Sequence, residues 1–443
     1  MRAVRIIASS AVLAAALFAV GALGPPASKK DGDAAVASSD TFAPATAALL
    51  TAGGSGDSNA LEQKVRSESA TPSDVATLAL TYLQRSRAEA DPAYLPRART
   101  LLERSLEMQP RDNFHALLGM ASLSNASHDF SGSARWSRRA IRVNPYNAAP
   151  YGLLGDALFE LGHYRATDAA YQKMIDIRPN VASYVRASYS AQFHSDSDAA
   201  LHAMELAIEA APHTGEEAAF LRHQRGDIFL SLGRVDRAYR ENRIGTKLAP
   251  GYAPPTVGVA ESLIARDRAA EPLEIMEEAV TDLPALEYQI KVGDLRTVVG
   301  DDQGATEAYA AAAAHLRDYR QNGVLPDVDF LLFYADRGIR VREALREARA
   351  VFANRPTSST ADALAWTLYA NGRTSAATKL ADRALRMAPT PDPLLYFHAG
   401  TIDRELGRDD EARRHFRRAL DLDPRFSLVY ASEARKALRL LGN

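Results

Sequence analysis

The sequence predicts an all-α solenoid, in which about ten helix-turn-helix units are stacked in a row. Three observations predict it: a proline that recurs at a nearly fixed interval, a glycine-containing turn between successive prolines, and apolar residues at helical spacing from about residue 61 onward. A period near 34 residues is typical of stacked two-helix units. The prolines are Pro110, Pro145, Pro179, Pro212, Pro250, Pro284, Pro356, Pro389 and Pro424, and the 72 residues between Pro284 and Pro356 correspond to two periods of 36.

Glycine and proline have separate roles within each unit. A glycine lies where the first helix is expected to end, as at Gly162, Gly233 and Gly372. The residue that follows a helix often takes a left-handed backbone conformation, which glycine adopts without steric cost. The proline then ends the second helix, because it has no N–H to donate.

The first 60 residues do not show the repeat. Arg2 and Arg5 precede an uncharged, largely apolar stretch over residues 6–24. This pattern fits either a cleaved signal peptide or an uncleaved membrane anchor, and both alternatives remain open. Residues 25–60 are small and polar, which predicts a disordered linker. We therefore expect an exported protein, either secreted or anchored at the cell envelope with an external solenoid over residues 61–443.

Composition excludes several classes of function. The 443 residues carry a formal net charge of −2 and contain no cysteine. Disulfides and cysteine-ligated zinc are therefore ruled out, and there is no basic excess of the kind that nucleic-acid binding requires. No catalytic or cofactor-binding motif occurs, and the ten histidines show no metal-ligand spacing. We expect a non-enzymatic protein without a cofactor, metal or nucleic-acid partner.

Residues in register within the units resemble the tetratricopeptide repeat family. One unit carries Tyr151, Leu154, Gly155, Tyr171 and Pro179, and the last carries Tyr396, Gly400, Ala412, Phe416, Ala419 and Pro424. The resemblance implies a right-handed solenoid, and residues 427–441 suit a C-terminal capping helix. Arginine outnumbers lysine 45 to 8, which we attribute to GC-rich coding, so a bacterial protein is expected.

The resemblance also implies that the first helices line an inner groove that binds a protein or peptide. The groove positions suggest a surface that is acidic in the middle and aromatic toward the C-terminal end. The alternative is that these rings pack between units. The candidate groove residues are Arg186, Tyr189, Phe193, Asp227, Glu261, Lys291, Asp294, Phe330, Phe333, Trp366, Tyr369, Phe397 and His398.

Three functions follow from these observations. The first is an interaction scaffold that binds one protein or peptide in the groove. The second is a chaperone-like assembly factor for a secreted or membrane complex. The third is an enzyme without a recognisable motif, which the absence of catalytic constellations disfavours. The sequence makes no prediction of the oligomeric state.

Overall fold

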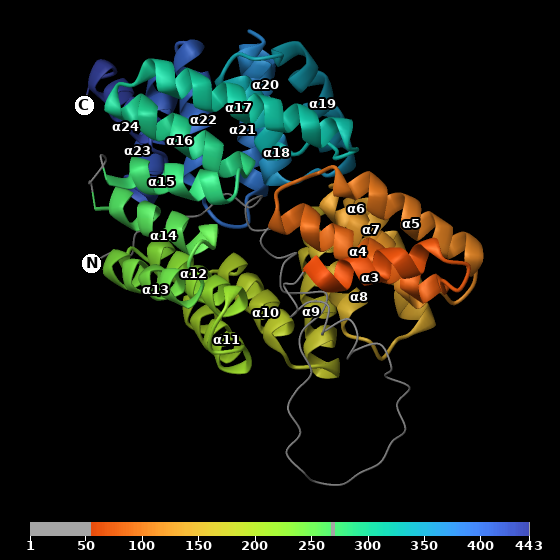
Figure 1. Ribbon diagram of the computed structural model, residues 1–443. Coiled ribbons are helices and arrows are strands. Elements are labelled where there is room, and N and C mark those ends of the chain that lie inside the picture. The colour runs from red at the N-terminus through yellow and green to blue at the C-terminus, as the bar shows by residue number, and fades with distance from the viewer. Residues whose placement is uncertain (1–54, 267–270, 443) are drawn as a thin grey trace.

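The repeated helix pairs predicted from the sequence are confirmed. The computed structural model describes residues 55–266 and 271–442, and within them it contains 22 helices and no strand. A leading helix, α3 (Ser55–Arg66), is followed by ten pairs, numbered here as units 1 to 10, and by a final helix, α24 (Tyr430–Leu440). Figure 1 shows the pairs following one another around the molecule.

The units have the following bounds. Units 1 to 5 are α4 (Pro72–Ala88) with α5 (Tyr94–Met108), α6 (Phe114–Ala126) with α7 (Phe130–Val143), α8 (Ala149–Glu160) with α9 (Tyr164–Ile177), α10 (Val181–Phe193) with α11 (Ser197–Ala210), and α12 (Glu216–Ser231) with α13 (Val235–Leu248). Units 6 to 10 are α14 (Ala253–Ile264) with α15 (Glu271–Asp282), α16 (Leu286–Val299) with α17 (Asp302–Gln321), α18 (Val328–Asp336) with α19 (Val341–Asn354), α20 (Ser358–Ala370) with α21 (Thr374–Met387), and α22 (Pro393–Glu405) with α23 (Asp409–Leu422).

The backbone conformation and the helix lengths explain the recurring glycine and the recurring proline. Gly162 and Gly372 have φ values of 77° and 70°, in the left-handed region that the turns require. In unit 2 and unit 4 the same place is taken by His128 and Ser195, with φ values of 58° and 62°. The unit without a closing proline has the longest second helix, since α17 spans 20 residues where α9 spans 14.

The helices of a unit approach closely where the repeat places a glycine. A Cβ atom on Gly155 would lie 2.3 Å from a ring carbon of Tyr171, and one on Gly293 would lie 2.3 Å from the equivalent carbon of Tyr309. An aromatic ring of the second helix therefore packs directly on the backbone of the first. This contact fixes the two helices of units 3 and 7 against each other.

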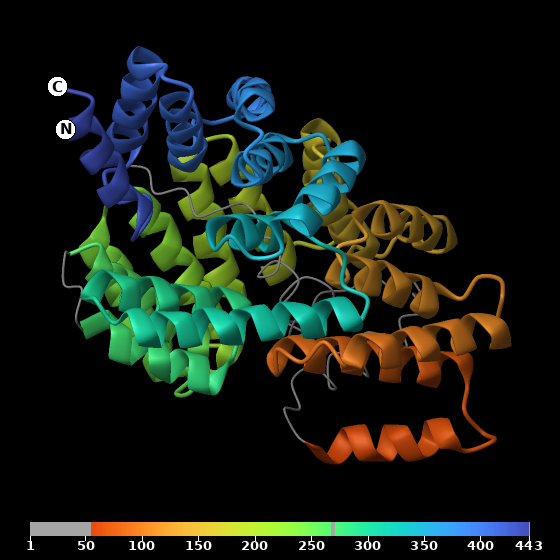
Figure 2. The same cartoon turned by 90° about the horizontal axis from the view of Figure 1, so that it is seen from above.

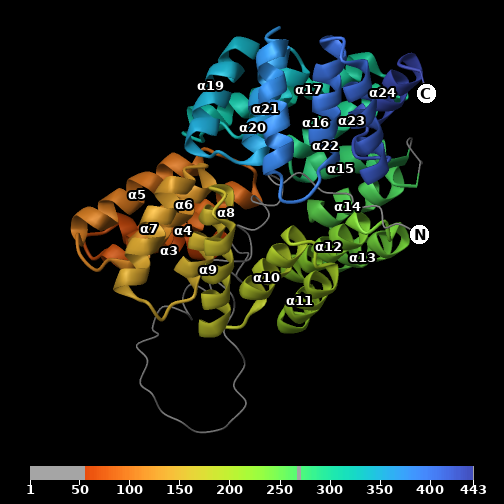
Figure 3. The same ribbon diagram turned by 180° about the vertical axis from the view of Figure 1, so that it is seen from behind.

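The solenoid curves until its later units meet its early ones. In Figure 1, α18 lies near α6, and in Figure 3, which shows the molecule from behind, α20 lies near α6 and α8. The backbone N–H of Leu325 donates to the carbonyl of Ser127 at 3.0 Å, and Arg355 bridges Glu160, at 3.0 Å, and Asp327. We call the contact through Glu160, Asp327 and Arg355 the clasp. Because the clasp joins units 3, 8 and 9, the units between them form a closed ring.

The structure tests some of the predicted boundaries at the two ends of the chain. The C-terminal capping helix is present as α24, which buries Ala431, Ala434 and Ala437. Residues 55–60, which we assigned to the linker, instead begin α3. The predicted signal peptide or anchor and the rest of the linker lie outside the described residues. Within the described part of the chain, we find no helix with the length and apolar character needed to cross a membrane.

Candidate functional site

The ring surrounds a channel with a volume of about 2130 Å³. Figure 2, which views the molecule from above, shows the helices arranged around this central space. Small-molecule sites commonly measure about 300–1,000 Å³, so the channel is larger than such a site. It has room for a segment of polypeptide.

Acidic side chains dominate the channel wall. Fourteen aspartates and glutamates line it, against six arginines and lysines, an excess of eight negative side chains. The whole chain has an excess of only two. Negative charge is therefore concentrated on the inner surface of the ring, where low-dielectric walls strengthen its effect on a charged ligand.

Burial perturbs several of these carboxyl groups. Burial raises the pKa of Asp227 to about 7 and, with help from Asp327 and Glu287, raises that of Asp329 to about 7. Burial also raises the pKa of Glu217 and of Glu287. These shifts arise because too few cations lie near the carboxylates to offset their desolvation.

An aromatic cluster lies on the same wall. The ring centroid of Phe193 is 5.0 Å from that of Phe159 and 4.3 Å from that of Tyr164, and all three side chains are half-buried. They come from units 3 and 4 and line the channel. Phe193 is thus a predicted groove residue that the structure places on the inner surface, with a face available for contact.

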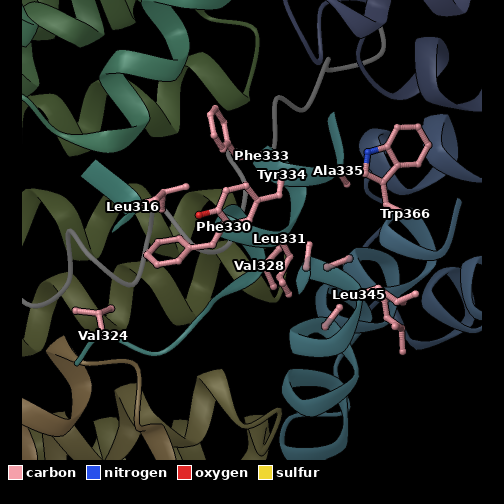
Figure 4. Close-up of a cluster of buried hydrophobic side chains, with 14 of the residues drawn as sticks. Leu316, Val324, Val328, Phe330, Leu331, Phe333, Tyr334, Ala335, Leu345 and Trp366 are labelled. Carbon is pink, nitrogen blue, oxygen red and sulfur yellow. The ribbon is translucent and has the colours of Figure 1, made fainter. Parts of the chain in front are cut away.

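Most of the other predicted aromatic anchors are buried, which corrects the expectation of an exposed aromatic surface. Phe330, Phe333, Trp366 and Phe397 have exposed fractions of 2–6% and belong to the main hydrophobic core. Figure 4 shows Phe330 near Tyr334 and Leu316 within a cluster of buried side chains. Rings on the first helices fill the space between neighbouring units, because stacking requires large apolar side chains there.

Several polar atoms of this aromatic region have partners within the protein. The indole N–H of Trp366 donates to Asp336 at 2.6 Å, and the indole stacks on His398 at a centroid distance of 4.0 Å and on the half-buried Tyr369 at 4.9 Å. His398 is 1% exposed and its Nδ1 lies 2.8 Å from Asp362. Burial lowers the pKa of His398, but the charge and hydrogen bond of Asp362 together with the charges of Asp336 and Asp392 outweigh burial, so the net shift is upward.

Arg186 and Tyr189 are likewise corrected to buried positions. Arg186 is 1% exposed and donates to Asp156 from Nε at 2.8 Å and from Nη2 at 2.6 Å. The Tyr189 hydroxyl donates to Gln224 of the next unit. Both side chains hold neighbouring units together and are not free to bind a partner.

Four of the predicted charged groove residues, Asp227, Glu261, Lys291 and Asp294, line the channel, but three of them are paired. Lys291 forms an ion pair with Glu261, and Asp294 accepts from Arg337 at 2.6 Å. Asp227 has no arginine or lysine within ion-pair distance among the described residues. The acidic middle of the predicted groove is therefore in part neutralised by neighbouring units.

Sequence reasoning missed a second group of carboxylates, at the junction of units 3, 8, 9 and 10. Five acidic residues line a small side cavity that we call the recess: Glu160, Asp327, Asp329, Asp362 and Asp392. They come from separate units, so no local motif joins them. Asp327 and Asp392 were recognisable as acidic residues just before helices, which is where N-cap residues lie. No group of three or more histidines or acidic residues in the described chain has a geometry that could hold a metal ion.

Comparisons with known proteins agree with the helix-pair architecture. Residues 148–181 and 393–426 each match a family model described as tetratricopeptide repeat. These segments coincide with units 3 and 10, so these two units match tetratricopeptide repeats. A search of curated protein sequences gives no match.

Several solved structures resemble the chain at low identity. The APC/C hetero-tetramer Cut9–Hcn1 is 12% identical, with 86% of this chain and 92% of that chain covered and a TM-score of 0.42. The human IFIT1 dimer with m7Gppp-AAAA is 15% identical, with 75% and 76% covered and a TM-score of 0.48. A tetratricopeptide repeat protein from Parabacteroides merdae is 14% identical, with 59% and 99% covered and a TM-score of 0.36.

Proposed function

We propose that this protein is a non-enzymatic scaffold that binds a segment of a partner protein inside the channel, at the cell envelope. The observation that carries the proposal is the acidic channel of about 2130 Å³, which is lined by first helices and closed by the clasp. Tetratricopeptide repeats generally form interaction scaffolds, which agrees with this function.

The channel wall also indicates the kind of partner. Its excess of acidic side chains repels a nucleic-acid backbone, so we propose a protein partner. The half-buried rings of Phe159, Tyr164 and Phe193 supply an apolar patch on which side chains of the partner pack. The proposed location at the envelope rests on the apolar N-terminal stretch alone.

Position-specific photo-crosslinking in the intact cell tests this proposal. A photoreactive phenylalanine analogue replaces Tyr164, on the channel wall, in the full chain with its N-terminal segment. The matched control carries the same analogue at Tyr146, which is 86% exposed and does not line the channel. We expect a discrete crosslinked product from position 164 and none from position 146.

The pattern of crosslinks separates the alternatives. A product only from position 146 contradicts binding in the channel. Many products of different mass from position 164 indicate a series of clients, and thus the assembly factor instead of a scaffold with one partner. Fractionation of the same cells checks the location, and crosslinking confined to the cytoplasm contradicts the envelope assignment.

A further inference from the structure

The recess beside the clasp contains carboxylate oxygens that the fold itself does not use. The recess has a volume of about 40 Å³. Two of its five acidic residues are helix caps: Asp327 accepts the N–H of Val328 at 2.7 Å, and Asp392 accepts the N–H of Leu394 at 2.8 Å. Capping accounts for these two carboxylates at the starts of α18 and α22.

The other three acidic residues are incompletely paired. Asp362 is 2% exposed, and its Oδ1 accepts no hydrogen bond from the described residues, although its Oδ2 is paired with His398. Glu160 is paired with Arg355 through Oε2, while its Oε1 accepts no hydrogen bond within the same residues. Asp329 forms no hydrogen bond or ion pair with the described part of the chain. A buried carboxylate oxygen without a donor is costly, so this arrangement calls for a further group.

The recess opens into the channel. Eight of its ten lining residues also line the channel, and Leu332, Leu394 and Leu395 are the apolar ones among the shared residues. A cationic head group can therefore enter from the channel while an aliphatic stem lies along these leucines. A cavity needs about 10–15 Å³ to hold one water, so the recess has room for a group of about that size, such as a primary ammonium.

We infer that the recess binds the ε-ammonium group of a lysine on the partner segment that occupies the channel. This inference rests on the proposed function. An ammonium group carries three donors and no acceptor, and the recess offers three incompletely paired carboxylates, on Glu160, Asp329 and Asp362. Metal binding is not the explanation, because these groups lack a metal-holding geometry in the described chain.

The charges around the recess predict how binding depends on pH. The groups that face or influence it are Glu160, Asp327, Asp329, Asp362, Asp392, Glu287, Arg355, His128 and His398. Burial raises the pKa of Asp329 to about 7 and that of Asp392 to about 6, and burial lowers the pKa of His128. A bound ammonium favours the ionised carboxylates, so affinity rises between pH 5.5 and pH 8, and binding near pH 7 releases protons.

A lysine-containing peptide provides the direct test. The probe is a seven-residue Gly/Ser peptide with one central lysine, and the matched probe carries acetyl-lysine at that position. By calorimetry on the full chain at pH 8, we expect the lysine peptide to bind at least about tenfold more tightly. Equal affinities for the two peptides overturn the inference, and so does a tenfold preference that does not weaken at pH 5.5.

Two neutral substitutions locate the effect. D329N and D362N are expected to remove the preference for lysine, whereas D410N, on the exposed surface and paired with Arg413, leaves it unchanged. In the absence of a peptide, D329N is also expected to raise the unfolding temperature at pH 8, because it removes an unpaired charge. A lower unfolding temperature would mean a structural role for Asp329 and contradict the inference.

Two further outcomes are informative. One distinguishes a free amine from a lysine side chain as the bound cation, and the other distinguishes failure of the recess inference from failure of the proposed function. If n-butylamine binds as tightly as the lysine peptide, the recess takes a free amine and not a partner side chain. If crosslinking from position 164 persists in D362N and the peptides bind equally, the recess inference fails while the proposed function stands. If the protein with no substitution in the recess gives no crosslink from position 164, the proposed function itself is contradicted.

Discussion

Units 3 and 5 carry the same Gly-Asp dipeptide at the same place in the repeat, yet the two aspartates differ in their surroundings. Asp156 of unit 3 accepts the hydroxyl of Tyr171 at 2.9 Å and is paired with Arg186 of the next unit. Asp227 of unit 5 has neither partner, because Asn242 stands in the place of the tyrosine and Val257 in that of the arginine. One dipeptide thus gives a buried structural ion pair in one unit and an underpaired carboxyl on the channel wall in the other.

The neighbour of Asp227 does not replace the missing cation. Asn242 donates through its Nδ2 to the carbonyl of Ala238, so its Oδ1 accepts from Nδ1 of His223. Burial lowers the pKa of His223 to about 4, so the ring is neutral at pH 7 and its Nε2, 3.4 Å from Asp227, carries no proton. Burial without a paired arginine or lysine accounts for the raised pKa of Asp227.

Unit 7 shows that the surrounding residues, and not the dipeptide, decide the outcome. Asp294 follows Gly293, accepts the hydroxyl of Tyr309 at 2.7 Å and is paired with Arg337 at 2.6 Å. Tyrosine on the second helix and arginine from the next unit recur together with the paired aspartate. Their joint presence distinguishes a structural aspartate from one that is free to act on a ligand.

The largest expected effect comes from breaking the pair in unit 3. R186M leaves Asp156 buried without its cation, so we expect a loss of about 3–5 kcal/mol in the free energy of unfolding. Urea denaturation at pH 7 measures it. R414M, which removes one arginine from an exposed pair with Glu411, serves as the control and is expected to change stability by less than about 0.5 kcal/mol. If R186M loses as little stability as R414M, Asp156 does not depend on its ion pair, and the described difference between Asp156 and Asp227 is wrong.

An intermediate effect is expected for the same change in unit 7. R337M removes a partner of Asp294, but both side chains are about one-fifth exposed and Tyr309 still donates to the carboxylate. We expect a loss of about 1–2 kcal/mol by the same measurement. A loss as large as that of R186M would show that exposure does not account for the difference between the units.

The smallest expected effect has the opposite sign. The pKa of Asp227 is raised to about 7 in the folded chain, above its unfolded value, so its ionisation destabilises the fold increasingly from about pH 4 to pH 7. D227N removes this cost and should stabilise the protein by about 1 kcal/mol at pH 8, with little change at pH 4. D156N, measured beside it, should be destabilising at both pH values. Destabilisation by D227N at pH 8 would assign Asp227 a structural role.

The fold was predictable because its signals are local and repeated. Proline and glycine residues at a 34-residue period predicted the helix pairs and their turns, and apolar spacing over residues 427–441 predicted the capping helix. The site was less predictable, since register identifies which helix face a residue occupies but not what packs against it. Phe333 and Trp366 lie on first helices as expected, yet neighbouring units cover them. The recess joins residues from four units, and their meeting depends on how far the solenoid curves.

If the channel binds a partner as proposed, the clasp limits which partners can enter it. An open groove accepts the middle of a chain from the side, whereas a closed ring must be threaded from one end of the chain or opened. A partner with folded domains on both sides of its bound segment can enter only if Arg355 separates from Glu160. Release of such a partner is then governed by the lifetime of the clasp as well as by contacts within the channel, so the ring can retain a weakly bound chain for longer than its affinity alone implies.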